Sequence, residues 1–130
     1  MNKIVISAGD VSLEAELNDS PTARQIWEAL PIVGTAQTWG DEIYFEIPVQ
    51  ANLEPDARAE VSVGELGYWP MGHAFCIFFG PTPSSVDERP RAYSPVTILG
   101  HVQGDATRLR AVPDGARVEI ARARTDRASA

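Results

Sequence analysis

Short runs of alternating apolar and polar residues, separated by glycine-containing turns, limit this chain to a small set of folds. Ile4 and Ile6 belong to one such run, and residues 13–17 alternate apolar side chains with glutamates. Gly9-Asp10 lies between the two runs, and glycine reaches a positive φ without steric cost, as a two-residue hairpin turn requires. The sequence therefore predicts a β-hairpin over the first 17 residues.

Residues 36–47 predict a second hairpin, whose Gly-Asp turn is at 40–41. Side chains of a strand alternate between its two faces. On the strand that leaves this turn, Glu42 and Tyr44 share one face and apolar side chains occupy the other.

One helix of ordinary length is predicted between the two hairpins. Ser20 can cap it, Pro21 suits the first helical position, and Pro31 ends it. A shorter helical turn is predicted over residues 106–112, after Asp105 as its cap.

Further short strands are predicted at 61–63, 74–79, 96–102 and 117–123. The run at 74–79 is almost entirely apolar and lies between two glycines, which favours a strand buried on both faces. Residues 80–95 contain four prolines and predict one long loop, and loops of that length in small domains are often functional.

Many short strands with one or two short helices predict a mostly β domain, and 130 residues suit a single core. We expect that domain to cover residues 1–123, with residues 124–130 as a frayed tail. A domain of this length buries roughly two-thirds of its unfolded surface, so it needs no metal or disulfide.

The charge and composition argue against several classes of protein. A formal charge of −7 disfavours nucleic acid as a partner, and no apolar run is long enough to span a membrane. The sequence has one cysteine and no recognisable secretion signal, so we expect a cytoplasmic protein. Eight arginines follow residue 88, and we interpret them as a solvated face rather than as a site for an anionic partner.

No phosphate-binding glycine loop, nucleophile elbow or metal-ligand spacing is present, so we expect no cofactor and no metal. Cys76 lies within an apolar run, where cysteines are usually inert packing residues. Two short stretches, 38–45 and 64–72, contain two of the three tryptophans and two of the three tyrosines. These rings suit either the wall of a ligand groove or the core of a barrel.

Four segments make the sequence recognisable: TWGDEIYFEIPV at 38–49, VGELGYWPMG at 63–72, CIFFGPTPSS at 76–85 and PVTILGHVQG at 95–104. Together they resemble the small bacterial and archaeal cyclophilin-like proteins, over nearly the whole chain. The resemblance implies a closed eight-stranded β-barrel capped by one or two short α-helices.

Cyclophilins in general catalyse cis–trans isomerisation of Xaa-Pro bonds, whose barrier is about 20 kcal/mol. They use an arginine in a Phe-His-Arg motif to bind the proline nitrogen as the bond twists. The matching stretch here, residues 38–48, has neither arginine nor histidine, and the Trp-Leu-x-Gly-x-His segment of the true enzymes is also absent. Loop arginines such as Arg58, Arg89 or Arg91 would have to replace that donor.

The leading hypothesis is a module that binds a peptide or small molecule and lacks the isomerase arginine, with Glu42 as polar anchor for an amine or amide. A weak or atypical peptidyl-prolyl isomerase is one alternative, and a structural subunit is another, so both monomer and homodimer stay open. The residues expected at the groove are Trp39, Glu42, Tyr44, Tyr68, Trp69, Pro70 and Phe79, with Pro83 and Ser84 on its rim.

Overall fold

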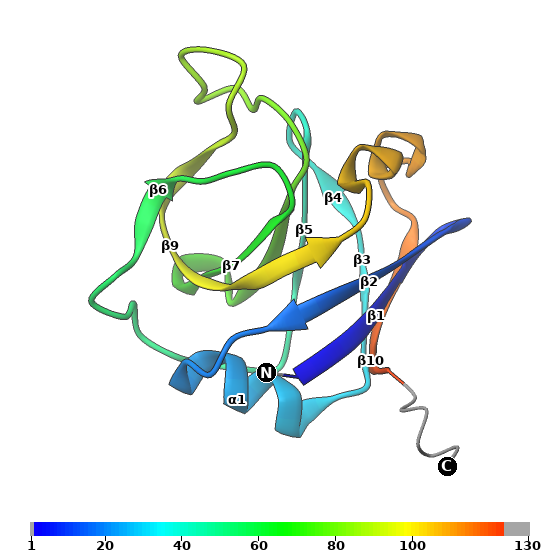
Figure 1. Cartoon of the computed structure of the whole chain (residues 1–130), viewed down its shortest axis with the longest axis vertical. Coiled ribbons are helices and arrows are strands. Elements are labelled where there is room, and N and C mark those ends of the chain that lie inside the picture. Colours follow the sequence, from blue (N-terminus) through cyan, green and yellow to red (C-terminus); the bar gives the residue numbers. More distant parts are fainter. Residues whose placement is uncertain (1, 124–130) are drawn as a thin grey trace.

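Antiparallel strands dominate the fold, as the sequence predicts (Figure 1). The computed structural model describes residues 2–123, so the tail predicted at 124–130 lies outside the described residues. No helix in the described part is both long and apolar enough to cross a bilayer. The elements in chain order are β1 (Asn2–Ala8), β2 (Val11–Leu17), α1 (Pro21–Ala29), β3 (Ile32–Thr35), β4 (Gln37–Thr38), β5 (Glu42–Glu46), β6 (Arg58–Glu60), β7 (Glu65–Trp69), the 3-10 helix η1 (Pro70–Gly72), β8 (Ala74–Phe78), β9 (Arg91–Gln103), the 3-10 helix η2 (Ala106–Ala111) and β10 (Arg117–Arg122).

The strands form one continuous sheet in the order β3-β10-β1-β2-β9-β7-β8-β5-β4, and β6 pairs separately with β9. Its two end strands, β3 and β4, follow each other in the sequence with only Ala36 between them. β3 pairs with β10 and β4 pairs with β5, so different residues make the two pairings. No ladder joins β3 to β4 within residues 2–123, and the closed eight-stranded barrel predicted above is therefore not confirmed.

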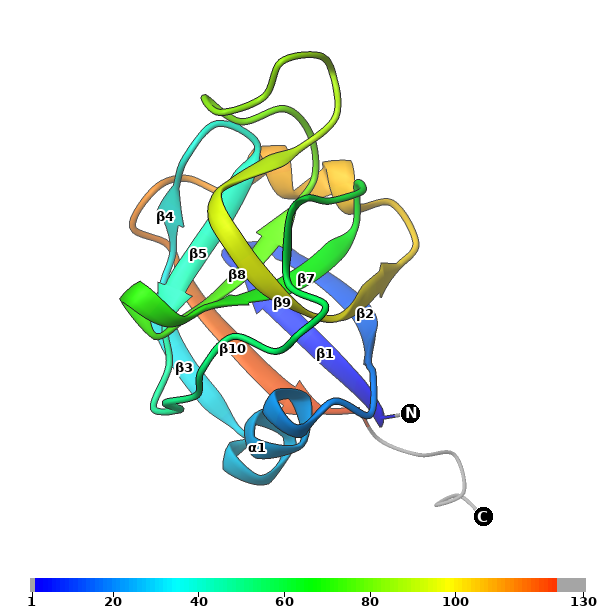
Figure 2. The same cartoon turned by 90° about the vertical axis from the view of Figure 1, so that its left-hand side faces the viewer.

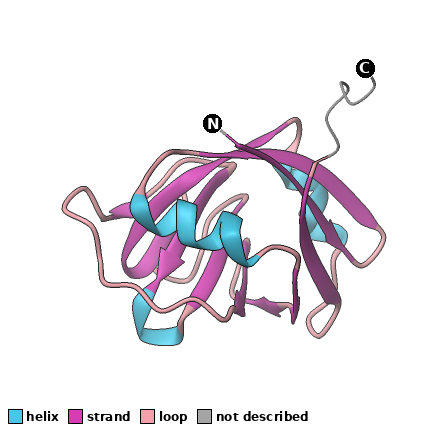
Figure 3. Ribbon diagram, turned by 90° about the horizontal axis from the view of Figure 1, so that it is seen from below, coloured by secondary structure: helices cyan, strands magenta, loops and turns pink. Residues whose placement is uncertain are grey.

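The first hairpin and the helix form as predicted. Gly9 has a φ of 56° in the turn between β1 and β2. At the start of α1, the Ser20 side chain accepts a hydrogen bond from the Ala23 N–H at 3.2 Å, and Pro21 is the first helical residue. The helix buries Ile26 and lies across one end of the sheet (Figure 3).

Several stretches differ from the prediction. Residues 61–63 are not a strand, whereas β7 forms where no strand was predicted. β3 was not predicted at all, and β9 begins inside the segment predicted as a loop. Only residues 79–90 between β8 and β9 are irregular, and this loop stands out from the sheet in two perpendicular views (Figures 1 and 2).

The sheet carries a hydrophobic core on each of its two faces. The main core includes Phe75 and Ile77 of β8, whereas Cys76 and Phe78 of the same strand belong to a second, smaller core with Val96. All residues of β8 are buried, which confirms the prediction of a strand covered on both faces.

A β-bulge bends β9 where it pairs with β7. Leu66 pairs with Gly100 but its neighbour Gly67 pairs with Ile98, so β9 has one extra residue there. Bulges bend a strand and increase its twist. As a result the first half of β9 pairs with β6, and its Ala92 and Val96 cover the second core.

Tyr68 holds the segment after β5 against the main core, which gives a first prediction. Its buried hydroxyl donates a hydrogen bond to the Val49 carbonyl oxygen at 2.6 Å and accepts one from the Ala51 N–H at 3.3 Å. Tyr68→Phe leaves both backbone groups without that partner, so we expect a loss of about 1–3 kcal/mol in the free energy of unfolding. Urea denaturation measures it, with Tyr93→Phe at an exposed tyrosine as the control. Equal stability of the two variants would contradict this role.

Candidate functional site

A cavity of about 170 Å³ lies on the side of the sheet that carries the second core. It is bounded by β5, β7, β8, the first half of β9 and the turn after β4. The residues that line it are Trp39, Glu42, Tyr44, Trp69, Cys76, Ala92, Tyr93 and Val96.

The alternation of strand side chains brings these residues to one face. Glu42 and Tyr44 are two residues apart on β5, so both point away from the main core. Cys76 of β8 is the direct cross-strand partner of Tyr44 and also of Gly67 on β7. Trp69 lies two residues beyond Gly67 and therefore shares that face.

Four aromatic rings form the walls of the cavity, and each meets the next nearly at right angles. The ring centroids of Trp39 and Tyr93 are 6.1 Å apart at 78°, and those of Tyr93 and Trp69 are 6.1 Å apart at 79°. Trp69 and Tyr44 follow at 6.3 Å and 83°. Edge-to-face packing of this kind is a favoured arrangement of aromatic pairs.

Trp69 is fixed from two sides. Its indole N–H donates a hydrogen bond to the Ser94 hydroxyl at 2.8 Å. Its ring also packs against Gly72, where an added Cβ would lie 2.7 Å from a ring carbon. The ring is therefore held in place by the protein itself.

Glu42 is the acidic group of the cavity, and its side chain is almost fully enclosed, with 5% of the residue exposed. Burial raises the pKa of Glu42 to about 7, and a weaker opposite effect comes from a hydrogen bond with the Cys76 thiol. Among the described residues, no basic side chain forms an ion pair with this carboxyl.

Cys76 lies beside that carboxyl but is not an activated thiol. Burial, followed by the nearby Glu42, raises the pKa of the Cys76 thiol well above its usual value. A thiol is nucleophilic as its thiolate. The sequence interpretation of Cys76 as a packing residue fits this geometry, and within the described residues no cluster of histidine, cysteine and carboxylate side chains could hold a metal.

The residues predicted from the sequence divide into two sets. Four of them meet in the cavity: Trp39, Glu42, Tyr44 and Trp69. The other five are elsewhere: Tyr68 and Phe79 are in the main core, Pro70 begins η1, and Pro83 and Ser84 lie in the loop between β8 and β9. The remaining lining residues, Cys76, Ala92, Tyr93 and Val96, were not predicted for the site.

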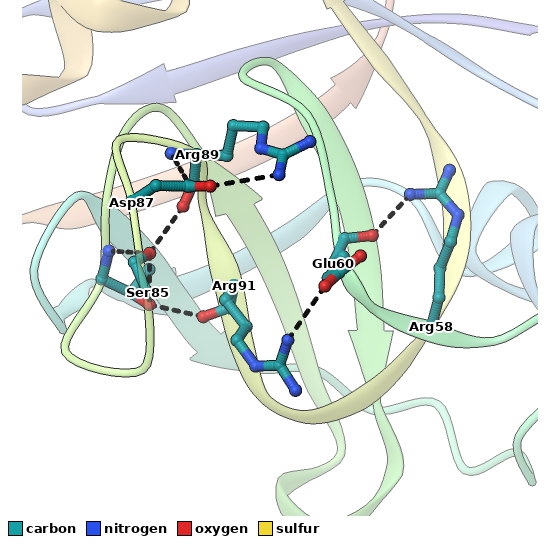
Figure 4. Close-up of polar contacts among 7 residues, drawn as sticks. Arg58, Glu60, Ser85, Asp87, Arg89 and Arg91 are labelled. Atoms are coloured by element: carbon teal, nitrogen blue, oxygen red, sulfur yellow. Dashed lines mark hydrogen bonds and ion pairs between the residues drawn. The ribbon is translucent and has the colours of Figure 1, made fainter.

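The arginines considered as replacement catalytic donors lie on β6 (Arg58), in the loop before β9 (Arg89) and on β9 (Arg91), and all three line a separate hollow. Figure 4 shows polar contacts of these residues. Arg91 forms an ion pair with Glu60 at 3.2 Å, and Arg89 forms one with Asp87 at 3.1 Å. Arg58 donates two hydrogen bonds to the carboxylate of Glu65, at 2.8 and 2.9 Å, and one to the Glu60 carbonyl oxygen. None of these three arginines lines the aromatic cavity.

The start of the loop between β8 and β9 is hydrogen-bonded to two other segments of the chain. The Pro81 carbonyl accepts a hydrogen bond from the Asp41 N–H at 2.9 Å, which ties the loop to the turn beside Trp39. The buried Thr82 hydroxyl donates to the Arg91 carbonyl oxygen at the start of β9. The loop therefore holds the turn that carries Trp39 close to the strand that carries Tyr93.

Comparison with known proteins places this geometry in a family. The sequence model of the Cyclophilin-like family matches residues 2–121. The chain belongs to the cyclophilin-like family. The solution structure of a hypothetical protein from Archaeoglobus fulgidus is similar to this cyclophilin-like chain, with 38% sequence identity and a TM-score of 0.80. That similarity covers 94% of this chain and 95% of the archaeal one. A search of curated proteins finds no match.

Proposed function

We propose that this cyclophilin-like domain is a binding module whose ligand occupies the aromatic cavity and contacts Glu42. The observation that carries the proposal is a buried carboxyl without an ion-pair partner among the described residues, enclosed by aromatic rings. Burying a carboxyl costs free energy that a purely structural position would avoid. Strongly shifted groups in clefts are typical of functional sites.

The cavity has the character of a small-molecule site. Such sites are mostly apolar, with a few polar groups that set the orientation of the ligand. Here four rings supply the apolar wall, and Glu42 and two tyrosine hydroxyls supply the polar groups. Because the rings are already held by packing within the protein, ligand binding costs little side-chain conformational entropy.

Isomerase activity is the weaker alternative, because its transition state needs a fixed donor at the proline nitrogen. The three candidate arginines are engaged with carboxylates around another hollow, and the lining of the aromatic cavity contains no arginine. A donor would have to leave an existing ion pair before it could act. A structural subunit role remains the third alternative, and size exclusion at two protein concentrations tests it.

The tryptophans provide a direct test of binding by NMR. Trp39 and Trp69 line the cavity, whereas Trp27 on α1 does not. We expect a short Ala-Pro peptide, or members of a set of small amines and amides, to shift the indole signals of Trp39 and Trp69 and to leave Trp27 unchanged. A set that shifts neither cavity tryptophan would contradict the proposal. Exchange peaks between the cis and trans forms of the peptide that appear only with protein would favour the isomerase.

Glu42→Gln tests the anchor itself. For any ligand that shifts the signals of both cavity tryptophans, we expect this substitution to lower the binding affinity by at least about tenfold. A hydrogen bond to a charged group contributes about 1.5–3 kcal/mol. Glu46→Gln is the matched control, because Glu46 lies on the same strand but is exposed. If Glu42→Gln instead unfolds the domain in a circular dichroism measurement, Glu42 is a structural residue and not the anchor.

A further inference from the structure

We infer that the ligand of the aromatic cavity carries a methylated ammonium group, held between the four rings and the Glu42 carboxylate. This inference rests on the proposed function and adds the chemical class of the ligand. It follows from the shape of the ring wall, the charge of the lining and the shortage of hydrogen-bond acceptors.

The arrangement of the rings favours a cation. The planes of successive rings meet at 78°, 79° and 83°, so the wall curves around the cavity. The rings follow in the order Trp39, Tyr93, Trp69 and Tyr44. The face of an aromatic ring carries negative potential, and cages of several rings bind quaternary ammonium groups. Two of the four rings are tryptophans, which bind cations more strongly than tyrosine or phenylalanine.

The charge of the lining points the same way. Glu42 is the acidic member of the lining, and none of the lining residues is lysine, arginine or histidine. The adjacent Asp41 is engaged outside the cavity, in an ion pair with Arg110 at 3.1 Å. An entering anion would therefore meet aromatic rings and a carboxyl group but no positive charge, whereas a cation has favourable partners in both. The formal charge of −7 also favours the approach of cations from solution.

The shortage of acceptors separates methylated from primary ammonium groups. A primary ammonium has three N–H donors that need acceptors when buried. The side-chain oxygens of the lining belong to Glu42, Tyr44 and Tyr93, and Tyr93 is largely exposed at the cavity edge. The rest of the lining is aromatic rings, small apolar side chains and the Cys76 thiol. N-methyl groups need no acceptor and can fill a cavity of about 170 Å³ by contact with the rings.

A bound cation would also change the protonation of Glu42. The titratable groups that share the cavity lining with this carboxyl are Tyr44 on its own strand, Cys76 on β8 and Tyr93 on β9, and none of them is a basic side chain. A cation therefore favours the carboxylate, and binding releases a proton when the carboxyl starts protonated. Because burial raises the pKa of Glu42 to about 7, the affinity should increase as the pH rises from 6 to 8.

Choline and its neutral isostere 3,3-dimethylbutan-1-ol form the decisive pair of probes, since they share size and shape but differ in charge. Both are titrated at pH 8 into the labelled protein, with the indole signals of Trp39 and Trp69 as the readout and Trp27 as the internal reference. We expect choline to bind at least tenfold more tightly than the alcohol. We also expect this preference to shrink between pH 8 and pH 6, and to fall in Glu42→Gln but not in Glu46→Gln.

The outcomes separate this inference from the proposed function. Equal binding of choline and the alcohol would overturn the cation class and leave the cavity as a binding site. If neither probe binds but an amide or peptide does, the cation class is likewise overturned and the cavity is still a binding site. No response of Trp39 and Trp69 to any compound would overturn both proposals.

Discussion

Replacing Gly100 by alanine should bring the domain close to unfolding at room temperature. A Cβ at this position would lie 1.8 Å from the Glu16 carbonyl oxygen and 2.9 Å from the Glu16 carbonyl carbon. Both atoms belong to the backbone of β2, so neither can move aside without breaking the pairing of β2 with β9. Gly100 also has a φ of 149°, which side chains rarely adopt. We expect a loss of more than about 4 kcal/mol, from a total that is typically about 5–15 kcal/mol.

Gly104 offers a matched control for this substitution. It too has a positive φ, of 101°, but a Cβ there would meet no atom within 4 Å. Gly104→Ala therefore reports the backbone strain alone, for which we expect about 1 kcal/mol. Urea denaturation followed by circular dichroism compares the two variants. If Gly100→Ala is no less stable than Gly104→Ala, β2 and β9 do not approach as closely as the structure has them.

The second large effect is a loss of stability of the wild-type domain as the pH rises from acid toward neutrality. Burial raises the pKa of Glu42 from 4.5 to about 7 in the folded state. The unfolded chain therefore ionises this group more readily than the folded domain does, and stability falls between about pH 4.5 and pH 7. The shift corresponds to about 3 kcal/mol in the free energy of unfolding, as an order of magnitude. The carboxyls of Glu65, Asp87 and Asp105 have lowered pKa values, so their contributions are lost at acid pH, below this window.

Glu42→Gln should remove most of this pH dependence. The informative quantity is the slope of stability against pH between 5 and 8, because the amide changes the absolute value by its own hydrogen bonds. Urea denaturation at four or five pH values gives that slope for wild type, Glu42→Gln and the exposed control Glu46→Gln. We expect the control to follow wild type. A wild-type curve that is flat across this range would show that the carboxyl is not desolvated as the structure implies.

The alternation of residues along β5 predicts two of the eight residues that line the cavity. Glu42 and Tyr44 had to share a face, and that face is the one that lines the cavity. The same reasoning fails at Tyr68 and Trp69, both assigned to the groove, because adjacent residues of a strand cannot face the same side. The sequence predicts no strand over the residues of β7, so this alternation was not applied to them.

The remaining site residues depend on long-range pairing that no local pattern encodes. Cys76 reaches the cavity through its register opposite Tyr44 on another strand. Tyr93 was assigned to a loop because prolines surround it, yet it lies on β9. Pro95 is tolerated within this strand because it has no ladder partner on β6 or β7, so its missing N–H leaves no bond unmade. Whether the sheet closes also depends on long-range pairing, because the residues before Ala36 pair with β10 and those after it pair with β5. No local pattern in the sequence encodes that choice.

The strand β8 belongs to both cores, and this constrains how the domain can change over time. Phe75 and Ile77 serve the interior, while Cys76 between them forms the floor of the cavity. Exchanges at Phe75 or Ile77 must preserve the volume of the main core, whereas an exchange at position 76 must fit the second core and the lining of the cavity. Neighbouring residues of one strand are thus under different packing constraints. An insertion or deletion of a single residue in β8 would exchange the two sets and destroy both cores at once.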